Sequence, residues 1–218
     1  GFVEVIRAVE RLARAHGASI RTGAEVVEIT TTDAVATGVR LSDGTRIPAD
    51  LVVSTADLHH TETTLLPPEL QTYPQKWWDK RVPSPGALLL LLGVEGELPQ
   101  LAHHTLLFAS KWRENFEDIF DAPTRISDPA SLYICRPSAT DDDVAPAGSE
   151  NLFVLVPVPA DPGIGHGGVD GDGDPAVETA ADHVIQQISQ WCGIPDLAER
   201  ITVRRTIAPR DFETDLHS

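Results

Sequence analysis

The sequence predicts a mixed α+β and α/β chain that is built mostly on an antiparallel sheet. Apolar runs of strand length recur along it: residues 87–94, 151–158 and 201–207. Two other segments repeat their apolar residues every three or four positions, which is the helical pattern: residues 2–15 and 175–192. Asp43-Gly44 lies between two short β-rich runs and is a strong hairpin signal. Since hairpins join antiparallel strands, these observations together favour an antiparallel sheet with interposed helices.

The N-terminal part is predicted to hold one helix and several short strands. The helix over residues 2–15 carries Glu and Arg on its polar side and ends at His16-Gly17. Short β segments follow it: residues 18–21, 25–31, 37–41, 46–48 and 51–54. Residues 51–53 are all apolar, so we expect the last strand to be covered on both faces. Residues 1–57 are therefore predicted to be a piece of an α/β layer and not a closed domain.

The remainder of the chain alternates strands with helices. After a proline-rich stretch, strands are predicted at residues 87–94, 105–108, 131–136, 151–158 and 201–207, and helices at 113–120 and 175–192. The segment 160–175 is rich in Gly and Asp, so we expect a flexible loop there.

Composition excludes several classes of function. The chain has 17 basic and 33 acidic residues, a net charge of −16 that repels phosphate backbones, so no nucleic-acid partner is expected. Its longest apolar run, residues 87–92, is far shorter than the roughly 18–20 residues of a membrane span. Two cysteines make no disulfide framework and no secretory leader opens the chain, so we expect a cytoplasmic protein. The chain starts at Gly1 and contains no methionine, so we expect a fragment of a longer protein.

One glycine motif has the spacing of a dinucleotide fingerprint but not its context. Gly163, Gly165 and Gly168 match G-x-G-x-x-G. A working fingerprint opens a helix whose free N–H groups face the pyrophosphate. Here three aspartates follow between residues 170 and 174, where they would repel the phosphates. We therefore predict a loop and not a phosphate cradle.

No metal site or catalytic residue is predicted from the remaining motifs. The three aspartates imitate half of a calcium loop, but its sixth position is Pro175 and its twelfth is Ala181. His59-His60 and His103-His104 are adjacent pairs, and we expect their side chains to diverge, so that each pair cannot share one ion. Both cysteines are expected to pack and not to act as nucleophiles.

Longer residue strings resemble a known family. The strings 22–29 and 36–57 resemble the middle of flavin-dependent oxidoreductases of the amine-oxidase type. Five later blocks, spread in order over most of the chain, are similar to bacterial phytoene desaturases: residues 65–69, 100–108, 113–121, 128–138 and 147–159. The chain thus resembles the central portion of an FAD-dependent carotenoid desaturase. The family's N-terminal glycine fingerprint and its C-terminal flavin-covering segment are not among these residues.

The resemblance implies a division of the chain by function. Residues 1–57 would belong to a flavin domain assembled from discontinuous segments. Residues 58–207 would form the substrate domain, with a mostly antiparallel sheet, and residues 208–218 would begin the return to the flavin domain. FAD is implied as the cofactor of the intact protein and is not expected to be retained by this fragment, which is expected to be inactive alone.

The resemblance also implies which residues meet the cofactor. Val26 would lie against the adenine end of FAD, and the turn at Thr55 and Ala56 would pass near it. Ordinary sheet packing is the open alternative for each of the three. The catalytic residues stay unknown.

The implied substrate is a carotenoid or another polyene, from which the flavin accepts a hydride in a dry channel. Such a hydrocarbon has no polar handle, so its binding must come from apolar contact, about 25 cal/mol per Å². Leu90, Leu92, Phe153 and Leu155 are expected to line the channel, with ordinary sheet core as the open alternative.

The implied substrate comes from a membrane, so we expect peripheral membrane contact. Trp77 and Trp78, flanked by cations at residues 76, 80 and 81, are the candidates for docking. A packed helix end is the open alternative for this pair. Two other functions also stay open: a different FAD-dependent polyene oxidase or isomerase, and a cofactor-free module that binds hydrophobic ligands.

Overall fold

The computed structural model describes residues 2–121 and 124–217. Its internal contacts divide the chain into two units, Gly1–Lys80 and Arg81–Ser218, which we call unit 1 and unit 2. All strand pairs within both units are antiparallel, as the sequence predicts. The division by function expected at residues 57 and 58 concerns cofactor and substrate and stays a prediction.

Unit 1 is built on a small sheet with the strand order β1-β2-β3. The predicted hairpin at Asp43-Gly44 is confirmed, because it joins the paired strands β2 and β3. Arg40 and Glu28 form an ion pair of 2.6 Å across β2 and β1. The helices and strands of the unit are α1 (Phe2–Ala15), β1 (Val26–Thr32), β2 (Val35–Leu41), β3 (Arg46–Pro48), α2 (Leu58–His60) and α3 (Gln75–Trp78), with a π-helical turn at Thr61–Leu65 and a 3₁₀ turn at Pro68–Leu70.

Two strands predicted for unit 1 are wrong. Residues 18–21 and 51–54 form no strand. Leu51 and Val53 are 78% and 75% exposed, the opposite of the double cover that their apolar run predicts. A run of this kind becomes a strand only when neighbouring strands supply hydrogen bonds on its edges, and no described strand pairs with it.

Helix α1 begins and ends where the sequence predicts, but its apolar side has no cover in unit 1. Val5, Ile6, Val9 and Leu12 are each between 61% and 66% exposed. The spacing of these residues therefore specifies a helix without specifying what packs on it.

Unit 2 contains a five-stranded antiparallel sheet with the order β5-β6-β7-β4-β8. The predicted strands and helices are confirmed to within about two residues, and α5 and β8 have the predicted bounds. The elements are β4 (Gly86–Glu95), β5 (His104–Leu107), α4 (Trp112–Phe120), β6 (Leu132–Cys135), β7 (Ser149–Val158), α5 (Pro175–Cys192), β8 (Ile201–Ile207) and α6 (Pro209–Leu216).

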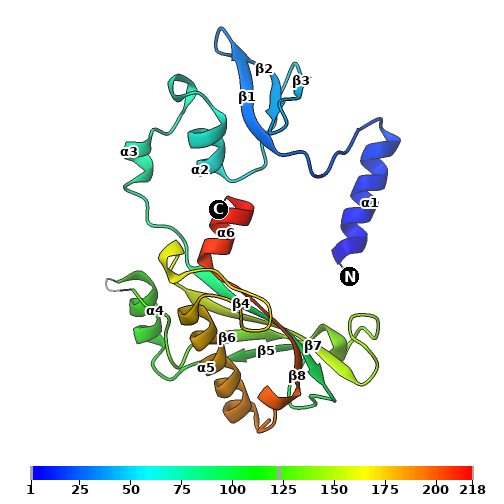
Figure 1. The fold of residues 1–218 in the computed structure, drawn as a ribbon, viewed down its shortest axis with the longest axis vertical. Coiled ribbons are helices and arrows are strands. Elements are labelled where there is room, and N and C mark those ends of the chain that lie inside the picture. Colours follow the sequence, from blue (N-terminus) through cyan, green and yellow to red (C-terminus); the bar gives the residue numbers. More distant parts are fainter. Residues whose placement is uncertain (1, 122–123, 218) are drawn as a thin grey trace. The chain divides into compact units, whose positions relative to one another are not determined.

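The core of unit 2 lies between this sheet and α5 (Figure 1). Burial alternates along β4 and β7, so that every second residue joins the core. From α5, the residues Val177, Ala181 and Ile188 pack into the same cluster and are fully buried. The helix ends at Gly193, whose φ of 68° is the left-handed conformation that glycine adopts without strain.

Candidate functional site

The register of the five strands sorts their side chains onto two faces of the sheet. Residues directly opposite each other in antiparallel strands project to the same side. Leu90 on β4 lies opposite Val154 and Thr206, and all three are buried. We call this side, which faces α5, the covered face. The next residue along β4, Leu89, projects to the other side, which we call the open face.

One row of the open face is apolar across the whole sheet. It holds one residue from each strand, in sheet order: Leu106, Tyr133, Leu155, Leu89 and Ile207. Leu106 is 60% exposed, and the other four are half-buried. Four steps of about 4.8 Å between strands give this row a length of roughly 19 Å.

The next row of the open face is apolar in the middle and polar at both ends. It consists of His104, Cys135, Phe153, Leu91 and Arg205. The rings of Phe153 and Tyr133 lie edge to face with their centroids 6.4 Å apart, which connects the two rows. Together the rows form a continuous apolar surface around Leu89, Leu91, Phe153 and Leu155.

The structure does not bring the four predicted substrate residues together. Leu90 and Leu92 are 0% and 2% exposed and belong to the core under α5. Phe153 and Leu155 project to the open face, on the other side of the sheet. The expectation that all four share one wall is therefore wrong, because successive side chains of a strand alternate between faces. A run of consecutive leucines hides this alternation in the sequence.

The edge of the covered face along β8 is polar and contains an ion pair between β8 and α5. Thr206 and Arg204 of β8 lie on this face and meet Glu178 of α5. Glu178 accepts hydrogen bonds from Thr206 Oγ1 at 2.5 Å and from Arg204 Nη2 at 2.6 Å. Burial would lower the pKa of the Arg204 guanidinium, but Asp182 and Glu178 outweigh it and hold this pKa above its usual value. The charges therefore attach α5 to the edge strand.

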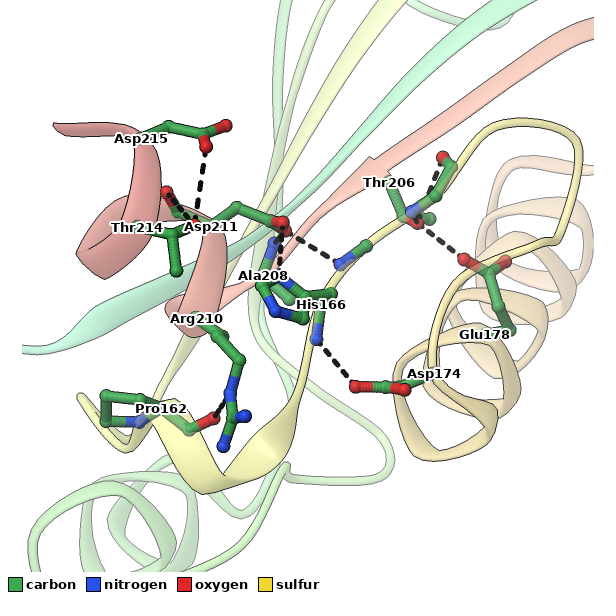
Figure 2. Close-up of polar contacts among 12 residues, drawn as sticks. Pro162, His166, Asp174, Glu178, Thr206, Ala208, Arg210, Asp211, Thr214 and Asp215 are labelled. Atoms are coloured by element: carbon green, nitrogen blue, oxygen red, sulfur yellow. Dashed lines mark hydrogen bonds and ion pairs between the residues drawn. The ribbon is translucent and has the colours of Figure 1, made fainter.

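A second polar centre holds the start of α6 (Figure 2). The Asp211 Oδ2 atom accepts hydrogen bonds of 2.7 Å from the backbone N–H groups of both Gly167 and Ala208. Its Oδ1 atom lies 3.0 Å from His166 Nδ1. Burial would raise the pKa of the Asp211 carboxyl, but the hydrogen bonds from Ala208, Gly167 and His166 outweigh it and lower this pKa. Asp211 thus acts as an anchor for the glycine-rich segment.

The glycine-rich segment is fixed along the free edge of β8 and is not the flexible loop that its composition predicts. Gly168 and Thr206 exchange hydrogen bonds, with Gly168 N–H donating to Thr206 Oγ1 at 2.8 Å and Thr206 N–H donating to the Gly168 carbonyl at 2.9 Å. Val169 forms an isolated β-bridge with Arg205. Low sequence complexity does not prevent order where backbone groups find partners.

The same contacts confirm that the G-x-G-x-x-G motif is not a phosphate cradle. A Cβ atom on Gly167 would lie 2.1 Å from the carbonyl oxygen of Thr206, and one on Gly168 would lie 2.2 Å from the nitrogen of Gly173. The absence of a side chain at these glycines therefore allows the backbone to pack closely against Thr206 and Gly173. Helix α5 begins only at Pro175, beyond the acidic stretch.

The predicted cofactor residues lie in unit 1. Val26 is half-buried in β1 and pairs with Leu41 of β2. Thr55 and Ala56 are exposed in the segment between β3 and α2. In residues 2–121 and 124–217 no glycine loop opens a helix toward a phosphate, so the described residues form no complete nucleotide cradle. Contacts of these three residues with FAD stay a prediction.

The predicted docking residues belong to an aromatic cluster in unit 1. Trp77 and Trp78 of α3 are half-buried. Trp78 Nε1 donates to the Tyr73 carbonyl at 2.9 Å, and the rings of Tyr73 and Trp77 lie 4.4 Å apart. His59 adds an edge-to-face contact with Trp78 at 5.0 Å. The pair is therefore partly packed and partly accessible.

The structure shows a second aromatic surface, on α4, that was not predicted from the sequence. Trp112, Phe116 and Phe120 of α4 follow one another at a spacing of four and are 59%, 58% and 43% exposed. The rings of Phe116 and Phe120 are stacked at 6.4 Å. Their spacing is visible in the sequence, but it is equally typical of a buried helix face. In the part of the chain that the structure describes, no helix is both long and apolar enough to cross a bilayer.

Unit 2 is thus an α+β unit, with α5 packed on one face of an antiparallel sheet and incompletely buried apolar side chains on the other. Comparison with known proteins gives the family: flavin containing amine oxidoreductases match residues 3–214. The chain belongs to this family.

Individual relatives are named for carotenoid chemistry. The chain is 38% identical to a carotenoid 3,4-desaturase of Haloarcula japonica, over 97% of this chain and 41% of that protein. It is 30% identical to a 4,4'-diapophytoene desaturase of Methylomonas sp, over 100% of this chain and 41% of that protein. A 4,4'-diapolycopene oxygenase of Methylomonas sp is 32% identical, over 100% of this chain and 42% of that protein. The chain therefore spans about two fifths of the length of these relatives.

Proposed function

We propose that this chain is part of an FAD-dependent carotenoid desaturase and that the open face of unit 2 binds the polyene. The desaturase relatives support the reaction class. The observation that carries the substrate contact is the row from Leu106 to Ile207, which is apolar on all five strands and incompletely buried. Apolar surfaces of this kind in a folded protein mark binding sites.

The physical role of the open face is to hold a ligand that offers no polar group. Leu89, Leu91, Phe153 and Leu155 supply apolar contact, and each fully buried side chain of this size contributes about 1.5–3 kcal/mol. A strip of roughly 19 Å aligns a linear chain along the sheet and leaves a bent or compact ligand poorly matched. FAD, when bound, accepts the hydride that desaturation removes from the polyene.

The assignment of cofactor and substrate to parts of the chain is also a proposal. Residues 1–57 contribute to the flavin domain, with Val26, Thr55 and Ala56 near FAD. Residues 58–207 form the substrate domain, and residues 208–218 begin the return to the flavin domain. The family match over residues 3–214, which include parts of both units, supports a flavoprotein origin for the whole chain.

The test uses the complete protein, expressed from its full reading frame, loaded with FAD and supplied with phytoene in liposomes. We expect new absorption from a longer conjugated polyene. Leu155→Asn on the open face should lower the rate at limiting substrate by about 10-fold or more, since it removes roughly 1.5–3 kcal/mol of apolar contact. Val35→Asn is the matched control, because Val35 is an exposed apolar strand residue in unit 1. No conjugated product would overturn the activity, and equal rates for the two variants would overturn the substrate contact.

A second candidate function has its own support. The relative named as an oxygenase matches the whole of this chain at an identity similar to that of the diapophytoene desaturase. The open face suits either reaction, because both act on a long hydrocarbon. Chromatography and mass spectrometry of the product separate the two. Loss of two hydrogen atoms per step supports the desaturase, and gain of oxygen supports the oxygenase.

Peripheral membrane contact through Trp77 and Trp78 completes the proposal. The two rings are partly accessible, and cationic residues at positions 76, 80 and 81 flank them. Trp77→Ala in the complete protein should reduce co-sedimentation with anionic liposomes by several-fold. Trp112→Ala on α4 is the comparison, since Trp112 is the more exposed tryptophan. Loss of binding only in Trp112→Ala would move the contact to α4 and overturn the assignment to Trp77 and Trp78.

A further inference from the structure

Three side chains that bind transition metals meet at the β5 edge of the sheet in unit 2. One ring nitrogen of His103, one of His104 and the Cys135 sulfur all lie within 4.8 Å of one another. His103 and Cys135 are half-buried and His104 is exposed. In a tetrahedral site with bonds of about 2.0–2.3 Å, such ligand atoms lie roughly 3.3–3.8 Å apart. Small side-chain rotations therefore suffice to close these three around one ion.

The strand pairing brings the three together, which corrects the expectation that adjacent histidines diverge. His104 and Cys135 lie directly opposite each other on β5 and β6 and so share the open face. His103 lies in a bend just before β5, where side chains no longer alternate. Its carbonyl accepts a hydrogen bond of 2.8 Å from Arg136 N–H, which fixes the bend against β6. The two histidine rings consequently lie 4.3 Å apart.

Each histidine ring is oriented by a hydroxyl group. His103 Nδ1 lies 2.8 Å from Thr140 Oγ1, and His104 Nδ1 lies 2.7 Å from the Tyr133 hydroxyl. A hydrogen bond at Nδ1 would leave Nε2 free to coordinate, and metal-binding histidines are commonly held by a hydrogen bond at their other ring nitrogen.

We propose that His103, His104 and Cys135 form a binding site for a transition-metal ion of the Zn²⁺ type. Two imidazoles and one thiolate suit Zn²⁺ and disfavour the oxygen-seeking cations Mg²⁺ and Ca²⁺. A fourth tetrahedral position would be left for water, since His104 is exposed. The thiol proton passes to solvent when the Cys135 sulfur binds the ion, so binding weakens as the pH falls.

The proposal does not rest on the desaturase function. His104 would attach the ion to the edge strand β5 and His103 to the bend before it, and Cys135 would attach the ion to β6. This link would stabilise the folded state by an amount that grows with the logarithm of the ion concentration above its dissociation constant. The site lies in the same row as Phe153, one strand away from it, and so borders the apolar surface without being part of it.

The test measures metal binding to the complete protein without an activity assay. After chelation and removal of the chelator, Zn²⁺ binding is measured by equilibrium dialysis with elemental analysis. We expect one ion per chain, and X-ray absorption should show one sulfur at about 2.3 Å and nitrogens at about 2.0 Å. Cys135→Ser should weaken binding by about 100-fold, because it removes one of three ligands. His104→Gln, at an exposed position that tolerates substitution, should weaken it similarly.

Cys192→Ser is the matched control. Cys192 is the second free cysteine of unit 2 and lies at the end of α5, where burial raises its pKa. This variant should bind Zn²⁺ as the unmodified protein does, and circular dichroism should show that all variants are folded. The proposal is overturned if no ion binds, if no sulfur ligand is detected, or if Cys192→Ser weakens binding as much as Cys135→Ser does.

Discussion

The two faces of the five-stranded sheet have nearly the same composition and different roles. On β4, Leu88, Leu90 and Leu92 of the covered face are at most 2% exposed. Leu89 and Leu91 of the open face alternate with them and keep part of their surface accessible. The difference arises from cover alone, because α5 packs on one face. A strand of five consecutive leucines can therefore supply core residues on one face and accessible apolar residues on the other.

The largest expected effect separates the two faces by their contribution to stability. Leu90→Ala should lower the free energy of unfolding by about 3 kcal/mol, since it leaves a cavity in a packed core. Leu91→Ala should lower it by only about 1 kcal/mol, because the leucine side chain is half-buried. Urea titration followed by tryptophan fluorescence measures both. Equal losses would show that the open face is also core and would remove the distinction on which the substrate proposal depends.

A smaller effect tests the charged edge of the covered face. Glu178→Gln should lower the free energy of unfolding by about 2 kcal/mol, because a neutral amide cannot replace the charged acceptor of Arg204. Asp182 is the other ion-pair partner of Arg204, and its side chain is 65% exposed. Asp182→Asn should therefore lower the free energy of unfolding by at most about 1 kcal/mol. Thermal melting compares the two variants. A larger loss for Asp182→Asn would mean that the exposed ion pair, and not the buried one, attaches α5 to β8.

The smallest expected loss of stability concerns the β8 edge of the sheet, where Asp211 binds the glycine-rich segment. Asp211→Asn should cost about 1 kcal/mol at neutral pH, since a neutral amide oxygen accepts less strongly than a carboxylate from the two N–H donors. Asp215→Asn, an exposed change on the same helix, should cost less. Denaturant titrations at several pH values measure both differences.

The pH dependence follows from the lowered pKa of Asp211. The pKa of Asp211 is lower in the folded state than its value of about 3.9 in the unfolded chain. The carboxylate therefore contributes its full stabilisation of the fold above about pH 3.9. This stabilisation is lost as the pH falls through the lower pKa that Asp211 has in the folded state. The difference between the unmodified protein and Asp211→Asn should therefore shrink in acid. A difference that grows below pH 4 would contradict the assigned direction.

Local sequence patterns predicted where most helices and strands begin and end. They did not predict which other elements pack against them. The bounds of α1, α5 and β8 agree with the predicted ones because helical spacing, the stop at His16-Gly17 and the alternation in β8 are local signals. The strand predicted at residues 51–54 failed because a doubly covered strand depends on neighbours that its own residues do not encode. Likewise, the exposed aromatic side of α4 and the exposed apolar side of α1 have the same spacing as buried helix faces.

The sequence by itself determined most of the longer helices and strands, the antiparallel character of the sheet, the hairpin and the family resemblance. These follow from residue spacing within one segment, or from strings of residues that the chain carries whole. Only the tertiary structure decided that Leu89 and not Leu90 faces outward, that the glycine motif packs on Thr206, and that His103 and His104 meet Cys135. Each of these depends on strand register and on a bend, which place residues far apart in the sequence at contact distance. Such contacts are set by the whole sheet, so no local pattern contains them.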